Sequence, residues 1–182
     1  MLKALDVANF FIDLTKDDPE DVMTNLRVNK LLYFAQGWSL VRNSEPLFED
    51  EIQAWKYGPV VPAVYRTFSE HGHNRIAAVR GEYSPNLFSS EQLELLLDIA
   101  REYGQYTSSA LVGITHRAGT PWKKVYAEGK NNPITQESMR GYFAGEKPLP
   151  TFEIDDNEDD YVGYRDPETG HYVLPADWDD DE

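Results

Sequence analysis

The chain has 182 residues, of which 41% are hydrophobic and 13% aromatic, and it carries a net charge of -15 at pH 7. This length and composition are typical of one globular domain with an appendage, and they exclude a wholly disordered chain. Cysteine is absent, which excludes disulfides, thiolate metal sites and cysteine nucleophiles.

The first half of the chain predicts helices around a small β element. Residues 2–14 have one apolar stripe, which predicts a short helix. Acidic residues follow directly after this segment, so we expect neither a signal peptide nor a membrane span, and hence a cytoplasmic protein. Thr24 can cap a second helix that continues through residue 41 and is apolar on more than one side, which is typical of a central helix. Residues 51–56 alternate as a half-buried strand does.

Glycine and proline predict how that strand ends. We expect Gly58-Pro59 to break it and Pro62 to open a helix that ends at Gly72. The segment 75–83 is consistent with a second short strand or with a loop.

Capping patterns predict the later helices. Ser89 with Gln92 forms a capping box, Thr107 or Ser108 can cap the next helix, and Thr120 followed by a proline at the first helical position opens another over residues 121–129. Thr135 can start a last helix. The sequence therefore predicts a mainly α protein: a compact bundle of six or seven helices with a small β element over residues 1–147, followed by an acidic β-hairpin arm.

The C-terminal extension, residues 148–182, differs in character. From residue 151 it contains 13 acids against one arginine, a net charge of -12, whereas residues 1–150 are nearly balanced at -3. Turn residues between two aromatic runs predict a hairpin at 161–174. Since no basic run exists, direct nucleic-acid binding is not expected. The tail is either a solvated, solubilising segment or an arm for a basic partner.

No residue pattern makes a strong catalytic or metal-site signal. His71 and His73 lack a nearby third ligand and are more consistent with a helix-terminating loop. His116 could present an acid–base imidazole, but a structural histidine at a helix corner is the simpler interpretation. Phosphate-loop, dinucleotide and zinc-protease motifs are absent. We therefore expect no catalytic, cofactor-binding or metal residues.

Three blocks of sequence stand out: residues 29–36, residues 46–48 with 51–60, and Thr115-His116 with Pro121-Trp122. In this order, over roughly residues 3–145, they resemble the Panacea domain of the SocA-like and GepA-like antitoxins of bacteria and phages. The scaffold positions of this resemblance are Lys30, Leu31, Tyr33, Phe34, Gln36, Trp55, Tyr57, Gly58, Pro59, His116, Pro121 and Trp122. The resemblance implies a mainly helical, non-enzymatic antitoxin that neutralises a cognate toxin by direct binding. The family's toxins include small alarmone-synthetase-like enzymes that attack translation. A SocA-like member instead acts as an adaptor that delivers its toxin to a bacterial protease.

Partner binding is expected to lie outside the generic scaffold. The candidate contacts are three tyrosines of the body, expected to be exposed, and four aromatics of the tail: Tyr33, Tyr57, Tyr65, Tyr161, Tyr164, Tyr172 and Trp178. The expected partner is a toxin with a basic nucleotide- or RNA-binding site. The alternatives are an adaptor that also engages a protease unfoldase and, from a different class, a hydrolase centred on His116.

Overall fold

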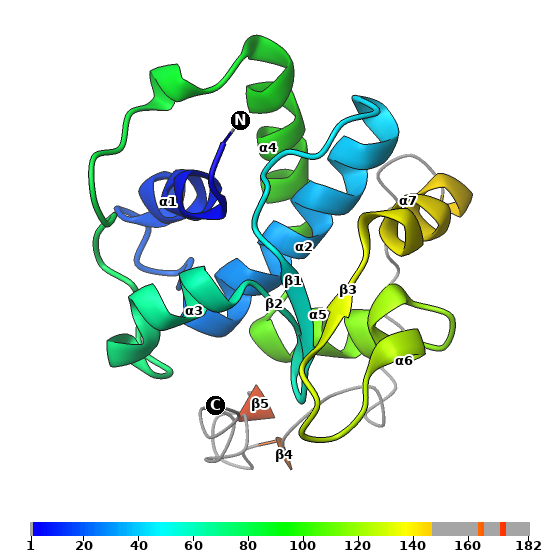
Figure 1. Cartoon of the computed structure of the whole chain (residues 1–182). Helices are drawn as coiled ribbons and strands as arrows, with labels where there is room; N and C mark the ends of the chain where they lie inside the picture. The colour runs from blue at the N-terminus through cyan, green and yellow to red at the C-terminus, as the bar shows by residue number, and fades with distance from the viewer. Residues whose placement is uncertain (1, 147–163, 166–171, 174–182) are drawn as a thin grey trace.

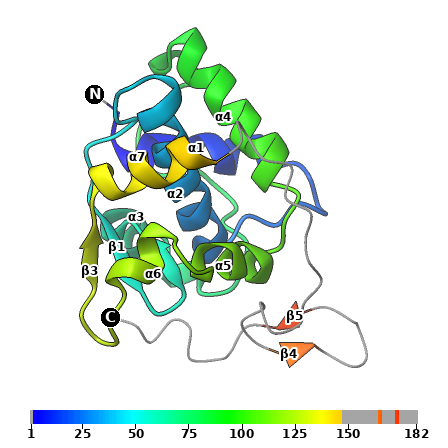
Figure 2. The same cartoon turned by 90° about the vertical axis from the view of Figure 1, so that its right-hand side faces the viewer.

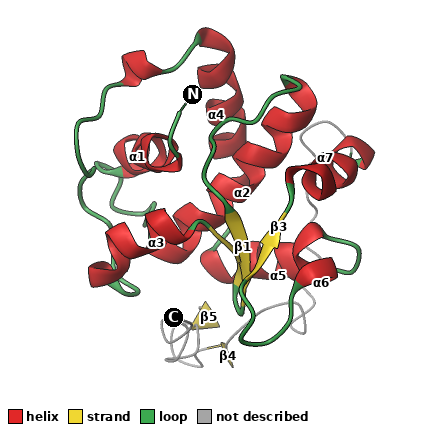
Figure 3. Ribbon diagram, in the orientation of Figure 1, coloured by secondary structure: helices red, strands yellow, loops and turns green. Residues whose placement is uncertain are grey.

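The computed structural model describes residues 2–146, 164–165 and 172–173. Seven α-helices and a three-stranded sheet make up residues 2–146 (Figures 1 and 3). The helices are α1 (Ala4–Thr15), α2 (Asn25–Arg42), α3 (Pro62–Phe68), α4 (Ser90–Tyr103), α5 (Ser108–His116), α6 (Pro121–Val125) and α7 (Gln136–Gly145). The predicted mainly α architecture with a small β element is confirmed.

The predicted helix starts are confirmed by their side-chain caps. The hydroxyls of Thr24, Thr107, Thr120 and Thr135 each accept a backbone N–H of the first turn. Ser89 forms the predicted capping box with the residue three positions on. Each cap satisfies an N–H that has no partner inside its helix, so these local sequence signals fix where the helices begin.

Helix α2 is the centre of the fold. All of its residues from Asn25 to Leu40 are buried, and α1, α3, α4, α5, α7 and strand β2 all pack against it (Figure 1). The view turned by 90° keeps α5, α6 and the sheet together at one end of the molecule (Figure 2). A helix that is buried on every side cannot be amphipathic, and the sequence of α2 correspondingly places apolar residues around its whole circumference.

The sheet corrects the prediction that Gly58-Pro59 breaks the strand. Strands β1 (Ile52–Trp55) and β2 (Gly58–Val60) form an antiparallel hairpin around a two-residue turn, and β3 (Asn132–Ile134) pairs on the other side of β1. Gly58 has a φ of 104°, which favours glycine. Pro59 is tolerated because β2 lies at the sheet edge. Strand β3 has no alternating pattern and was not predicted.

Two helices are shorter than expected. Helix α3 ends at Phe68 and gives way to the 3-10 turn Ser69–His71, so the chain is no longer α-helical near Gly72. Helix α6 ends at Val125 instead of continuing to residue 129, because the backbone turns extended and the Asn132 side chain donates to the freed Val125 carbonyl at 2.8 Å. The segment 75–83 contains no strand.

Aromatic side chains build the contact between α2 and α7. The Phe143 ring of α7 lies 5.5 Å from the Tyr33 ring and 5.4 Å from the Trp38 ring, both in edge-on geometry. Phe34 stacks on Tyr103 at 3.9 Å, and the Trp38 indole donates to the Tyr103 hydroxyl at 2.9 Å. The aromatic side chains of α2 therefore lie in the core.

Two short strands are described in the C-terminal extension, within the predicted hairpin. Strands β4 (Tyr164–Arg165) and β5 (Tyr172–Val173) pair antiparallel, with Tyr164 opposite Val173. Tyr161, Trp178, the hairpin turn and the expected boundary at residues 147 and 148 lie outside the described residues. Within the described part of the chain, no helix is both long and apolar enough to cross a membrane.

Gly37 provides a test of the α2–α7 packing. A Cβ on Gly37 would lie 2.2 Å from a ring carbon of Phe143, which is 1% exposed and enclosed by other rings. We expect Gly37→Ala to lower the free energy of unfolding by about 1–3 kcal/mol, since overpacking outweighs alanine's helix preference.

The matched control is Gly141→Ala on α7, where nothing lies within 4 Å of the added Cβ. Alanine there should raise stability by about 0.5–1 kcal/mol. Urea denaturation of both variants measures the difference. A Gly37→Ala protein as stable as Gly141→Ala would contradict the packing described.

Candidate functional site

The three blocks of the sequence motif meet at one end of α2. Lys30 on α2, the β1–β2 hairpin, the end of α5 with His116, and α6 with Trp122 contact one another there. We call the set formed by Lys30, Trp55, Gly58, Pro59, His116 and Trp122 the motif framework.

Helix α2 supplies the hydrogen bonds that the outer edge of β2 lacks. The Lys30 ammonium donates to the Pro59 carbonyl at 2.9 Å, and the Asn29 amide oxygen accepts the Val61 N–H at 2.9 Å. Asn29 in turn donates to the Asn25 carbonyl at 2.9 Å. An uncovered strand edge inside a protein would leave backbone groups unpaired, so these polar side chains are what allow the sheet to pack on α2.

Gly58 is required by this close approach. A Cβ at that position would lie 2.6 Å from Lys30 Cε and 2.7 Å from Thr115 Oγ1. Both neighbours are completely or almost completely buried. Glycine is therefore favoured at position 58 for two reasons: the hairpin lies close to α2 and α5 there, and the residue has a positive φ.

Rings stacked on Trp122 tie α5 and α6 to the hairpin. The His116 ring stacks on Trp122 at 3.8 Å and 5°, and Tyr126 stacks on Trp122 at 4.5 Å. The Trp122 indole donates to the Trp55 carbonyl at 2.8 Å. Thr120 fixes the corner between the helices by donating to the Thr115 carbonyl at 2.7 Å. The motif aromatics therefore hold together three separate segments of chain.

The two titratable groups of the motif framework are both driven towards neutrality. Burial lowers the pKa of Lys30 to about 7. Burial, followed by the charges of Lys30 and Lys123, lowers the pKa of His116 to about 3. At neutral pH the imidazole is uncharged, and its Nε2 has no hydrogen-bond partner among the described residues.

The contacts of Lys30 and His116 are packing contacts and a hydrogen bond to the backbone. The carbonyl of Pro59 is the hydrogen-bond acceptor that holds Lys30, whose side chain is completely buried. The hydrogen bonds and ion pairs found in the described part of the chain bring no carboxylate to His116 that could orient it as a base. His116 thus packs at a helix corner, in line with the simpler interpretation of the sequence.

The expectation that three body tyrosines are exposed is wrong. Tyr33, Tyr57 and Tyr65 are 1%, 6% and 4% exposed. Tyr33 packs among the core rings, where burial raises the pKa of its hydroxyl well above the ordinary value. Tyr65 lies edge-on against Trp55, and Tyr57 contacts the Lys56 ammonium at 4.9 Å. Tyr33 belongs to the main core, whereas Tyr57 and Tyr65 belong to a smaller buried cluster with Trp55, so a partner surface has to be sought elsewhere.

His71 and His73 follow α3, as expected for the end of a helix. His71 ends the 3-10 turn, with its Nε2 3.4 Å from the Arg80 guanidinium and 3.7 Å from the Glu70 carboxylate. Among the described residues, no group of three or more histidine, cysteine or acidic side chains is arranged to hold a metal ion.

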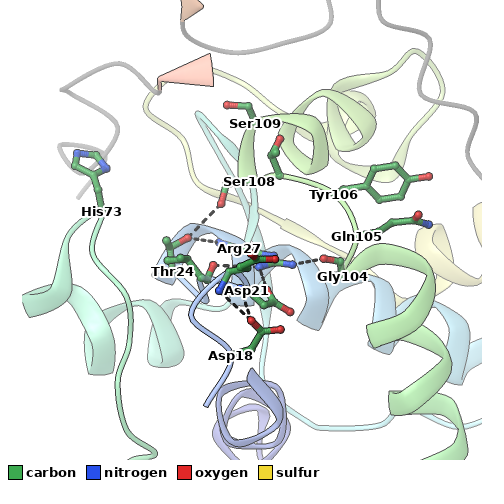
Figure 4. A pocket seen from close by; sticks show the side chains of 13 residues that line it. Asp18, Asp21, Thr24, Arg27, His73, Gly104, Gln105, Tyr106, Ser108 and Ser109 are labelled. Carbon is green, nitrogen blue, oxygen red and sulfur yellow. Dashed lines mark hydrogen bonds and ion pairs between the residues drawn. The ribbon is translucent and has the colours of Figure 1, made fainter. Parts of the chain in front are cut away.

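A groove of about 910 Å³ lies apart from the motif framework (Figure 4). Asp18, Glu20 and Asp21, from the segment between α1 and α2, line one side. The connection between α4 and α5 and the first two residues of α5, together residues 104–109, line another side, and His73 lies at the margin. Much of the lining is apolar, with the acids added to it.

Arg27 and two hydroxyls hold the sides of the groove together. The buried Arg27 guanidinium donates to the Asp21 carboxylate, to the Val22 carbonyl at 3.1 Å and to the Gly104 carbonyl. The hydroxyls of Thr24 and Ser108, at the starts of α2 and α5, are 3.3 Å apart. The groove is therefore fixed by contacts between segments that are far apart in sequence.

Comparison with known proteins places the motif framework in a family. The profile of the family described as "Antitoxin SocA-like, Panacea domain" matches residues 28–123, more than half of the chain. The chain belongs to the SocA-like Panacea-domain family. The match includes every scaffold position of the sequence motif, from Lys30 to Trp122. Membership in a family of antitoxins points to a regulatory protein that works without catalysis.

A curated protein that is similar to this chain is also named as an antitoxin. The chain is 35% identical over 126 residues to "Antitoxin SocA" from Caulobacter vibrioides (strain NA1000 / CB15N), a match that covers 64% of this chain and 66% of the relative. The matched part is thus slightly less than two thirds of that relative's length. No solved structure matches the chain.

Sequence reasoning missed the polar side of α2 and the groove. Asn25 and Asn29 lie one helical turn apart in the buried helix α2, and Asn25 donates to the Tyr65 carbonyl at 2.9 Å. Two asparagines one helical turn apart in a helix expected to be central could have indicated that their side chains bind backbone groups of a neighbouring strand or loop. No sequence pattern indicated the groove, because the segments that form its sides are far apart in sequence and meet only in the folded chain.

The Lys30 amine gives the Panacea-domain fold a pH dependence. Its pKa is about 7 in the folded chain and near 10.5 when unfolded, so between these values the unfolded state binds the extra proton. The free energy of unfolding should therefore rise from pH 7 towards pH 9.5, by at most about 1.4 kcal/mol per pH unit. Lys30→Met should remove this rise.

The measurement is urea denaturation of both proteins at half-unit steps between pH 7 and 9.5. The range stops there because ionisation of buried tyrosines, whose pKa values are raised, favours unfolding at higher pH. Lys30→Gln, which keeps a donor without a charge, is the second neutral variant. Equal slopes in all three proteins would show that Lys30 does not titrate as described.

Proposed function

We propose that this protein is an antitoxin that neutralises a cognate toxin by binding it directly in the cytoplasm. The observation that carries the proposal is the match to the antitoxin family over residues 28–123, together with the 35% identical relative named Antitoxin SocA. The motif framework, in which Lys30, Trp55 and Trp122 are buried, is a packed support on which a binding surface can be placed.

The alternative of a hydrolase centred on His116 has little support. The imidazole is stacked on Trp122 and neutral at pH 7, and burial opposes its protonation. A general base is usually held by an orienting group, which the described residues do not provide for Nε2. Binding is therefore the better account of the geometry.

The C-terminal extension is proposed as a second contact with the toxin. Its net charge of -12 from residue 151 onward is combined with Tyr161, Tyr164, Tyr172 and Trp178. A toxin acting on nucleotides or RNA needs a basic site for phosphates, and the carboxylates of an arm could compete for that site. We infer that residues 148–182 act as this arm.

The main test is co-expression with the product of the adjacent gene. We expect growth rescue and co-purification of the two proteins at a fixed stoichiometry. His116→Gln should rescue growth to the extent that it stays folded and bound. A His116→Gln protein that is stable and binds the toxin but fails to rescue would contradict the non-enzymatic function. Rescue that disappears in a host lacking a bacterial protease would instead favour an adaptor.

The arm is tested with a chain that ends at Pro150. We expect this chain to keep the thermal unfolding of the body and to associate with the toxin on the order of tenfold more slowly, because steering by the acidic tail is lost. Stopped-flow mixing at 0.1 M and 0.5 M salt measures the rate. Equal association rates and full growth rescue would leave the tail without a role in binding.

A further inference from the structure

The groove beside Arg27 has the properties of a preorganised docking surface. Arg27, 6% exposed, joins the α1–α2 segment to the Gly104 carbonyl, and the Thr24 and Ser108 hydroxyls join the starts of α2 and α5 (Figure 4). Surfaces that are already fixed lose little conformational freedom when a partner binds. The groove lies outside the motif framework, whose side chains are used up in packing.

The lining combines apolar surface with acidic side chains. Val22, 41% exposed, lines the groove, and Leu14, 49% exposed, lines a smaller cavity that shares Asp21 and Arg27 with it. The Asp18 carboxylate accepts the N–H groups of residues 20 and 21 and makes no ion pair among the described residues, while the Arg75 guanidinium is held by the Asp18 backbone carbonyl at 2.7 Å. Glu20 makes no ion pair among the described residues.

These features select a basic occupant. The starts of α2 and α5 do not favour an anion here, because the hydroxyls of Thr24 and Thr107 already accept N–H groups and the carboxylates of Asp18 and Glu20, which make no ion pair among the described residues, also line the groove. A second copy of the chain, with a net charge of -15, would be repelled.

We propose that this groove is the docking site for a basic segment of the cognate toxin, one that inserts an apolar side chain beside Val22 and places lysine or arginine near Asp18 and Glu20. The inference rests on the proposed function and adds the surface and the chemistry of the contact. Charges at the margin of an interface act mainly on the association rate, whereas the buried apolar contact acts mainly on dissociation.

The experiment measures binding of the purified product of the adjacent gene to the full-length chain. The first variant is Asp18→Asn/Glu20→Gln, which removes both carboxylates. The asparagine keeps a side-chain oxygen that can accept the backbone N–H groups, so the turn should stay folded. We expect association on the order of tenfold slower at 0.1 M salt, with the difference shrinking at 0.5 M. Val22→Ser should speed dissociation on the order of tenfold.

Matched controls remove the same groups elsewhere. Glu128→Gln/Glu137→Gln removes two exposed carboxylates outside the groove, and Leu87→Ser removes an apolar side chain that is 49% exposed in the 3-10 turn Pro85–Leu87. Both should bind like the unaltered chain. Thermal unfolding of every variant shows that the fold is retained.

The outcomes separate the inference from the function beneath it. Slower association confined to the groove variants supports the docking site. Groove variants that bind like the controls, while the unaltered chain forms the complex, overturn the docking site and leave the proposed function standing. Absence of any complex with the unaltered chain overturns the proposed function and this inference with it.

Discussion

The fold depends on burying α2 from all sides together with its polar residues. A helix enclosed by five other helices and a strand gains a large apolar contact, but each buried amide or ammonium must find a partner. Lys30 and Asn29 meet this requirement by bonding to the outer edge of β2, at Pro59 and Val61. The edge of a three-stranded sheet and the polar side of the central helix therefore satisfy each other, and either one alone would be unstable.

That mutual pairing explains why the family motif is spread over three distant blocks. The amine of Lys30 can reach the hairpin only if Gly58 leaves space, and the hairpin is held in place by the Trp122 indole on the Trp55 carbonyl. His116 completes the arrangement as a neutral ring stacked on Trp122. Residues that look like a catalytic selection in sequence are thus parts of one packing solution.

Local signals allowed much of the fold to be predicted, and long-range contacts account for what could not be. The caps at Thr24, Ser89 and Thr120 act within one helical turn, so the sequence around them is sufficient to locate the helix starts. Strand β3 and the burial of Tyr65 depend on partners far along the chain, which no local pattern encodes. The candidate groove was missed for the same reason: Arg27 closes it by reaching a carbonyl 77 residues away.

The motif framework and the groove are separate parts of the molecule and are constrained in different ways. Substitutions in the framework disturb the pairing of α2 with the sheet, so those positions are constrained by stability whatever the toxin is. Glu20 and Val22 are partly exposed and make few contacts, which leaves them free to change with the partner. Specificity placed on such positions can be altered without unfolding the domain, because the contacts that hold Arg27 to Asp21 and Gly104 are made by other groups. A rigid core with an adjustable margin would therefore let the proposed docking surface change while the fold stays intact.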